Sequence, residues 1–434
     1  MTEWKNWAGL ETASPRRTLE PRSTDEIVTA VLAARELGQP VKMIGTGHSF
    51  TAISAPEHTM LRPTHLGGIV AVDRTAMTVT ALAGTQLKTL NAELERLGLS
   101  LHNMGDIAEQ TLAGAVSTGT HGTGGVVSGL AAQLAALELV TGTGEVIAAS
   151  PTENADVFDL ARVGLGALGI LTTLTFQVEP LFVLEADERP GTWEQTIASY
   201  DELVDANHHV DLYWFPHTDR MLIKANNRLD VPLGEAEPLS RWRGWLDDDF
   251  LSNTFFGALT RVLNLAPAAI PRANEVAARA LTARTYSDTA HRVFVARRTV
   301  VFREMEYAVP RAAGMAALRE ARRVIDASDW KISFPVEIRC APAEDVALST
   351  AQGQDSVYLA FHVHRDADHE AYFRAVEQVM VEHGGRPHWG KLHTRTAEDL
   401  AATYPRFGDF QALRDRLDPD RLFTNPYLRR VLGD

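Results

Sequence analysis

The feature that most constrains this chain is residues 41–55, VKMIGTGHSFTAISA. A short apolar run ends there in Gly45-Thr46-Gly47, and His48 and Ser49 follow at once. Two glycines one residue apart let the backbone turn with positive φ and approach a ligand closely. Consecutive N–H groups in such a turn form a concavity for anionic oxygen. An ordinary strand-ending turn with a surface histidine is the competing interpretation.

A second glycine-rich run, residues 114–125 (GAVSTGTHGTGG), again carries a histidine, His121, among glycines and hydroxyls. Two such backbone cradles in the first third of the chain indicate a long ligand with a charged middle, such as a dinucleotide.

Composition and charge exclude several classes of protein. A net charge of −14 over 434 residues disfavours nucleic acids and anionic membrane surfaces as partners. No apolar run approaches the ~18 residues that span a bilayer, and the N-terminus lacks the apolar region of a secretory signal. Cys340 is the single cysteine, which excludes an internal disulfide and fits a reducing cytoplasm. The length predicts two domains, since one domain usually has ~100–200 residues.

Three motifs in order carry a resemblance to a known family: GTGHSF, then GDIAEQTLAGAVSTGTHGTG (residues 105–124), and HWGK (residues 388–391). Together they resemble flavoproteins of the vanillyl-alcohol-oxidase type, nearest to the aldonolactone oxidase and alditol oxidase branch. The resemblance implies an α+β, two-domain FAD-binding (PCMH-type) fold. Residues 1–180, completed by about 396–434, would bind FAD; residues 181–395 would form an antiparallel-sheet substrate cap domain. The resemblance to this family is weakest between about residues 185 and 299.

The element pattern independently favours α+β, because helices alternate irregularly with hairpins. Helices are predicted at residues 24–37, 87–97, 155–163 and 370–383, and hairpins at 69–82 and 134–148. Later strands are predicted at 211–215, 291–302, 331–339 and 356–364, with helices and loops over 240–283. Residues 164–169 spell a literal GxGxxG, but a helical pattern precedes it and a strand pattern follows it. This reversed order excludes a nicotinamide Rossmann site.

Glu337 and Arg339 lie two apart on a predicted strand, so their side chains share a face. A structural ion pair is one interpretation. The resemblance implies another, in which Arg339 binds a substrate oxygen and Glu337 orients hydroxyls. His362, in the strand AFHVH, matches the family histidine that faces the flavin, although a satisfied strand histidine fits as well. The C-terminal histidines show no zinc-type spacing, so no metal site is expected.

Lys391 of the HWGK motif would stabilise negative charge at the N1–C2=O edge of a reduced flavin. A solvated surface lysine is the alternative. In relatives with a histidine at the position of His48, the resemblance implies a bond from its ring to the flavin 8α-carbon. We therefore expect FAD bound covalently through His48. The full expected cofactor-binding set is Ile44, Gly45, Thr46, Gly47, His48, Ser49, Gly105, Asp106, Thr111, Gly114, Ala115, Ser117, Thr118, His121, Gly122, Ile170 and His388.

The sequence thus predicts FAD-dependent oxidation of a CH–OH group of a sugar-derived 1,4-lactone of the arabinono or gulono type, with O2 as acceptor and H2O2 as product. In the resembled enzymes a glycine at the position of Gly105 leaves O2 a path to the flavin; alternatively, Gly105 only makes a turn. An alditol oxidase of the xylitol or sorbitol type, or a dehydrogenase with another acceptor, remains open. A metal-dependent hydrolase and a noncatalytic sugar-binding protein are rivals from other classes.

Overall fold

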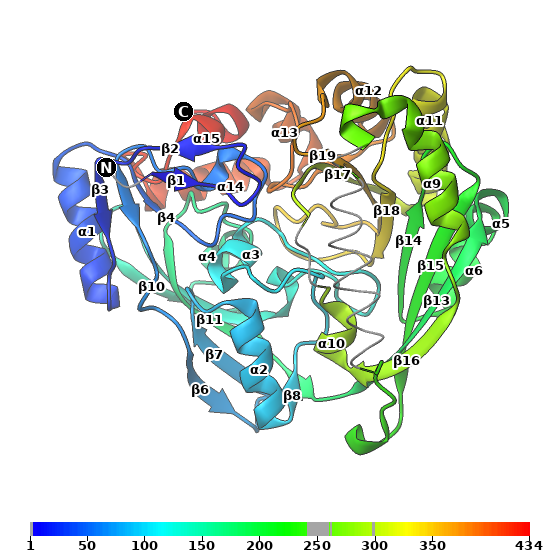
Figure 1. Cartoon of the computed structure of the whole chain (residues 1–434). Helices are drawn as coiled ribbons and strands as arrows, with labels where there is room; N and C mark the ends of the chain where they lie inside the picture. Colours follow the sequence, from blue (N-terminus) through cyan, green and yellow to red (C-terminus); the bar gives the residue numbers. More distant parts are fainter. Residues whose placement is uncertain (1–2, 241–259, 261–262, 297–299) are drawn as a thin grey trace.

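The computed structural model describes residues 3–240, 260, 263–296 and 300–434, which form two sheet-based halves (Figure 1). The blue and cyan segments and the red C-terminal helices gather around small sheets on one side, and the green and yellow segments build a large sheet on the other (Figure 1). The α+β prediction is confirmed by this mixture of helices and mainly antiparallel sheets. Within the described ranges, no helix is long and apolar enough to cross a membrane.

The first half contains a parallel and an antiparallel sheet. The parallel sheet has the order β3 (Arg17–Leu19), β5 (Thr59–Leu61), β4 (Val41–Met43). The antiparallel sheet has the order β10 (Val146–Ala149), β9 (Leu134–Val140), β11 (Ile170–Gln177), β7 (Thr78–Leu82), β6 (Ile69–Asp73). Two short ladders join β1 (Trp4–Lys5) to β2 (Thr12–Ala13) and β8 (Leu99–Ser100) to β12 (Glu179–Pro180).

Three of the described helices in this half lie where the sequence predicts them, whereas α3 (Leu112–Ser117) was not predicted. Helix α1 (Thr24–Glu36) starts at Ser23, whose hydroxyl accepts a hydrogen bond from the Glu26 N–H. Helix α2 (Leu87–Leu97) ends at Gly98, which adopts the left-handed conformation with φ 69° that glycine tolerates best. Helices α3 (Leu112–Ser117) and α4 (Ala155–Ala161) bury apolar side chains in the same core as α2.

The second half is an eight-stranded antiparallel sheet. Its order is β16 (Arg284–Thr289), β13 (Val183–Thr192), β15 (Arg220–Leu229), β14 (His209–Trp214), β18 (Val336–Ala341), β19 (Ser356–His364), β17 (Phe302–Pro310), β20 (Arg386–Pro387). Within the described ranges, the helices of this half are α5 (Trp193–Ala198), α6 (Tyr200–Ala206), α9 (Ile270–Arg279), α10 (Ala290–Phe294), α11 (Arg311–Asp326) and α12 (Glu370–Glu382).

The two faces of the large sheet differ in chemistry because successive side chains alternate between them. On one face Leu212, Ile338 and Leu359 pack with apolar side chains of α5, α11 and α12. The opposite face carries, on neighbouring strands, Asp211 and Glu337 together with the further polar side chains Arg339, His362, Glu304 and Glu306. We call this second surface the polar face; its contacts with Asp106 and His121 show that it looks toward the first half.

The chain end packs against the first half. Helices α13 (Ala397–Thr403), α14 (Phe407–Leu417) and α15 (Pro426–Leu432) share its main core, and α14 contacts α4. The Asn425 side chain accepts the Leu428 N–H at the start of α15 and donates to the carbonyls of Ala52, Ile53 and Ala55. The division into residues 1–180 with 396–434 and residues 181–395 stays our proposal.

Two secondary-structure predictions need correction. Residues 291–302 are not one strand: His291 and Arg292 lie in α10 and form ion pairs with Glu95, so tertiary contacts override the β-type composition, and residues 297–299 lie outside the described part. The strand predicted from residue 331 begins only after Pro335. The prediction for residues 240–283 falls partly on 241–259 and 261–262, also outside the described part; within the rest, α9 is helical as expected.

Candidate active site

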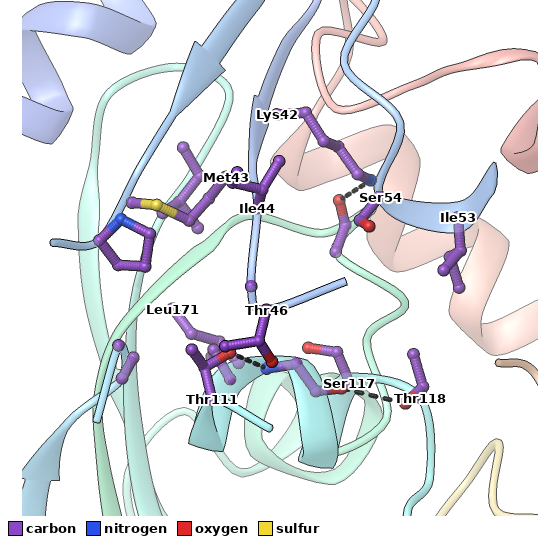
Figure 2. A pocket seen from close by; sticks show the side chains of 18 of the residues that line it. Lys42, Met43, Ile44, Thr46, Ile53, Ser54, Thr111, Ser117, Thr118 and Leu171 are labelled. Carbon is purple, nitrogen blue, oxygen red and sulfur yellow. Dashed lines mark hydrogen bonds between the residues drawn. The ribbon is translucent and has the colours of Figure 1, made fainter. Parts of the chain in front are cut away.

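The first cradle forms where the chain leaves β4 and passes the start of α3. Gly47 has φ +77°, and a Cβ on Gly45 would lie 2.6 Å from the Thr111 hydroxyl, so a side chain at Gly45 would collide with it. Thr111 caps α3, and its hydroxyl accepts the Gly114 N–H at 3.3 Å. Figure 2 shows Thr46 and Thr111 between the end of β4 and α3. Glycine at these turns is therefore required by close approach.

A cleft with about 940 Å³ of empty space, partly open to solvent, runs along this cradle. Eleven of the seventeen expected cofactor-binding residues line it: Ile44, Gly45, Thr46, Gly47, His48, Ser49, Thr111, Gly114, Ser117, Thr118 and Ile170. Six lie outside its lining: Gly105, Asp106, Ala115, His121, Gly122 and His388. Ala115 is fully buried in the core, whereas the other five lie near the polar face or in the second glycine-rich run.

The cleft also contains residues that the sequence did not single out. Lys42 lines it and donates a hydrogen bond from Nζ to the Gly166 carbonyl at 2.9 Å (Figure 2). Burial, helped by the charge of Arg414, lowers the pKa of Lys42 to about 7. Gly166 and Gly169, from the rejected GxGxxG, lie between α4 and β11, which confirms the reversed order, and both line the cleft. The sequence around Lys42, a lysine on a short strand, contains no pattern that predicts a place in a ligand cleft.

His48 also lines this cleft. Its ring stacks on Trp7 with centroids 5.5 Å apart and an interplanar angle of 22°. Its Nδ1 is buried and has no hydrogen-bond partner among the described residues. Burial lowers the pKa of His48, and Lys391 lowers it further, so the ring is held neutral. A neutral, oriented imidazole with an unused buried nitrogen fits an attached or closely bound group.

Arg339 organises one part of the polar face. Its Nη2 lies 2.7 Å from Glu337 and 3.5 Å from Asp106, and its Nε lies 3.0 Å from Asp211. The Tyr213 hydroxyl donates to Glu337 at 2.7 Å. Among the described residues, no hydrogen bond uses Nη1 of Arg339, so one edge of the guanidinium remains for a substrate oxygen. Both sequence interpretations of this pair, ion pair and substrate contact, are compatible with this geometry.

Lys391 lies on a second part of the polar face, close to the first cradle. The Phe50 N–H donates to the Gly390 carbonyl at 2.7 Å, and the Lys391 ammonium lies 5.1 Å from the Phe50 ring centre. The ammonium is paired with Glu304, whose other oxygen lies 3.5 Å from His362 Nε2. Lys391 is therefore a paired, mostly buried cation next to the segment that carries His48.

His121, Glu306 and His388 form a buried cluster whose possible ligand atoms lie within 4.8 Å of one another. His121 Nδ1 lies 2.8 Å from the Gly122 carbonyl and its Nε2 2.8 Å from Glu306, so both ring nitrogens face acceptors. Both nitrogens of the ring are therefore already engaged by acceptors of the protein. Burial lowers the pKa of His388 to about 4, and its Nδ1 accepts the Gly390 N–H. The arrangement favours a hydrogen-bonded His121–Glu306 pair over a metal site.

Sequence reasoning missed the two acids on β17. Glu304 and Glu306 are two apart in FREMEYAVP, so they share a face as Glu337 and Arg339 do. Burial alone would raise the pKa of Glu306, but His121, His388 and Lys391 hold it well below its usual range. The alternation was visible in the sequence; the cationic partners come from distant segments and were not.

The residues fit the cofactor that the sequence implies. Two glycines in the cradle allow close backbone approach, which suits a pyrophosphate, and the cleft suits a long ligand. His48 lines the cleft, and the segment that follows it contacts the loop of Lys391, which lies on the polar face.

Comparison with known proteins agrees with this geometry. Residues 174–431 match the family described as D-arabinono-1,4-lactone oxidase, and residues 15–150 match an FAD binding domain. L-gulono-1,4-lactone dehydrogenase of Mycobacterium tuberculosis is 38% identical over 430 residues, covering 99% of both chains. L-gulonolactone oxidase of Scyliorhinus torazame is 30% identical over 440 residues, covering 99% of this chain and 98% of the relative.

Among solved structures, cholesterol oxidase from Brevibacterium sterolicum superposes with a TM-score of 0.82 over 99% of this chain and 96% of that chain. The sequence identity is 18%, so this likeness shows the two-domain FAD-binding fold alone.

Proposed function

Because the chain belongs to the D-arabinono-1,4-lactone oxidase family, we propose that it oxidises a CH–OH group of an arabinono- or gulono-type 1,4-lactone. The resemblance found in the sequence is confirmed at the level of family, FAD-binding domain and lactone oxidoreductase class. The hydrolase and noncatalytic interpretations are wrong accordingly. The observation that supports the proposal is the contact of the His48 segment with the loop that carries Lys391, together with the Arg339–Glu337 pair on the same polar face.

Bound FAD supplies a hydride acceptor. The residues of this chain bind the cofactor, orient the substrate and stabilise developing charge. The cradle from Gly45 to Ser49 would hold the pyrophosphate through backbone N–H groups. Arg339 would hold a substrate oxygen through Nη1, while Glu337, fixed by Arg339 and Tyr213, would accept a substrate hydroxyl hydrogen bond. Lys391 would stabilise negative charge that develops in the transition state. We also propose that His48 bonds FAD covalently, supported by its buried, unpartnered Nδ1.

The electron acceptor is proposed to be O2, with H2O2 as product. The relative from Scyliorhinus torazame is named an oxidase, and the relative from Mycobacterium tuberculosis is named a dehydrogenase. The sequence hypothesis for Gly105 gains a second aspect from the structure: a Cβ there would lie 2.9 Å from the His121 carbonyl oxygen. The close approach of two backbone segments is thus sufficient to explain a glycine at position 105. A role of Gly105 in oxygen access would be additional.

Purified protein in aerated buffer tests the proposal. L-gulono-1,4-lactone, D-arabinono-1,4-lactone and xylitol are each supplied, and oxygen uptake and peroxide are recorded with and without an artificial electron acceptor. We expect peroxide with a lactone. Turnover with lactone only when the artificial acceptor is present makes the protein a dehydrogenase, and faster turnover with xylitol makes it an alditol oxidase. A cytoplasmic location stays a proposal based on the single, buried, unbridged Cys340.

A further inference from the structure

Glu304 contacts two side chains of the proposed site, Lys391 and His362. One of its oxygens is paired with the Lys391 ammonium, and the other lies 3.5 Å from His362 Nε2. The Glu304 side chain is 5% exposed and that of Lys391 is 18% exposed, so this contact is largely shielded from water. His362 is further fixed by a contact of Nδ1 with the Pro335 carbonyl at 3.1 Å.

The backbone repeats the same connection. The Leu392 N–H donates to the Glu304 carbonyl at 2.9 Å, and the His388 N–H donates to the Glu306 carbonyl at 3.0 Å. Strand β17 therefore holds the HWGK loop through two backbone bonds that flank Lys391, while Glu304 holds the Lys391 side chain. The Phe50 ring, 5.1 Å from the ammonium, is attractive but gives little direction.

A buried ammonium requires this kind of partner, because the cost of removing both charges from water is recovered only by good pairing. Burial alone would raise the pKa of Glu304, yet Lys391 and His362 outweigh it and hold the pKa at about 2. The carboxylate is therefore charged at neutral pH.

We propose that Glu304 is a positioning residue, whose carboxylate holds the Lys391 ammonium and the His362 ring in fixed relation to each other on the polar face. This inference rests on the proposed function, which places Lys391 beside the flavin. Glu304 does not touch the substrate in this arrangement; it acts through Lys391. Its removal should therefore have an effect that depends on whether Lys391 is present.

Four proteins test the proposal: wild type, Lys391→Ala, Glu304→Gln and the double variant. Glu304→Gln should slow anaerobic flavin reduction by about 10–100-fold, the loss typical when the partner of a functional side chain is removed. Glu304→Asp keeps the charge and should lose less. Glu377→Gln is the matched control, because Glu377 is an equally buried carboxylate that accepts hydrogen bonds from Tyr307 and Thr394 on the other side of the sheet. It should leave the reduction rate unchanged.

The flavin midpoint potential provides a readout other than activity. Lys391→Ala leaves the buried Glu304 carboxylate without its ammonium partner, so it should lower both the potential and the unfolding temperature. Adding Glu304→Gln removes that orphaned charge. The double variant should therefore have a higher potential and a higher unfolding temperature than Lys391→Ala, although Glu304→Gln alone slows reduction.

The outcomes separate the inference from the function on which it rests. If the two substitutions have additive effects on both unfolding and potential, Glu304 does not act through Lys391 and the proposal is overturned. If Glu304→Gln speeds reduction and raises the potential, Glu304 only dampens the Lys391 charge, which also overturns it. If unfolding shows the coupling but neither substitution moves the potential, the ion pair stands, and the placement of Lys391 beside the flavin is wrong.

Discussion

Replacing Arg339 by alanine should lower the free energy of unfolding by more than the lost packing of one side chain explains. The substitution also leaves several buried acids without their cation. Glu337 and Asp211 pair with the guanidinium at 2.7 and 3.0 Å, and the Arg339 side chain is 11% exposed. Breaking a buried pair by removing one partner costs about 3–5 kcal/mol. Kinetically, Arg339→Ala should raise KM as well as lower kcat, because Nη1 can hold a substrate oxygen already in the ground state.

The pH dependence of this destabilisation has a definite sign. Burial raises the pKa of Asp211, and Glu337 and Asp106 raise it further, while Arg339 opposes them. Without Arg339 the folded variant holds a proton on Asp211 at a pH where the unfolded chain has released it. The free energy of unfolding of the variant is therefore highest below the carboxyl pKa of the unfolded chain. It falls as the pH rises through the raised carboxyl pKa of the folded variant. The difference from wild type should therefore be smaller at pH 5 than at pH 8.

Thermal unfolding at pH 5 and pH 8 measures both effects. Arg311→Ala is the matched control, since Arg311 also pairs with two aspartates, Asp201 and Asp205, whose side chains are 74% and 69% exposed. Surface pairs contribute about 1 kcal/mol or less, so this variant should lose little at either pH. Equal losses for the two arginine variants, or a loss for Arg339→Ala that grows toward pH 5, would refute the reasoning.

Three further substitutions follow from the site. His48→Ala should move the yellow colour from the pellet to the supernatant after acid precipitation; free FAD from the wild type contradicts the covalent bond. Lys391→Ala should slow flavin reduction by about 10²–10³-fold, lowering kcat and kcat/KM together. An unchanged reduction rate in stopped-flow experiments makes it structural. Gly105→Ala should slow reoxidation by O2 while anaerobic reduction stays nearly intact, and loss of both rates instead indicates the collision with the His121 carbonyl, 2.9 Å from the added Cβ.

Local signals were sufficient for most elements of the first half. Ser23 at the start of α1 and Gly98 at the end of α2 are cap residues whose preference is set by neighbouring backbone, so sequence alone locates them. The segment at residues 291–302 has β-type composition but forms α10 at its start, because His291 and Arg292 reach Glu95 across the molecule. Such long-range pairing leaves no local trace.

The site divides in the same way. The glycine cradle was predictable, because a close backbone approach restricts side-chain size at Gly45 and conformation at Gly47. The partners of the functional side chains were not, because they come from segments that are far apart in the sequence. Glu304 with Lys391, and His121 with Glu306, pair strands with loops that periodicity cannot connect. The motifs indicated which side chains are functional, and the fold shows which charged groups lie beside each of them.

Anaerobic mixing of the purified protein with L-gulono-1,4-lactone or D-arabinono-1,4-lactone tests the central claim most directly. The flavin absorbance is followed in a stopped-flow instrument, with xylitol as the parallel substrate and Arg339→Ala as the parallel protein. The account predicts rapid bleaching by a lactone, slow or no bleaching by xylitol, and weaker lactone saturation in the variant. A flavin that stays oxidised with both lactones, or that xylitol bleaches faster, would contradict it.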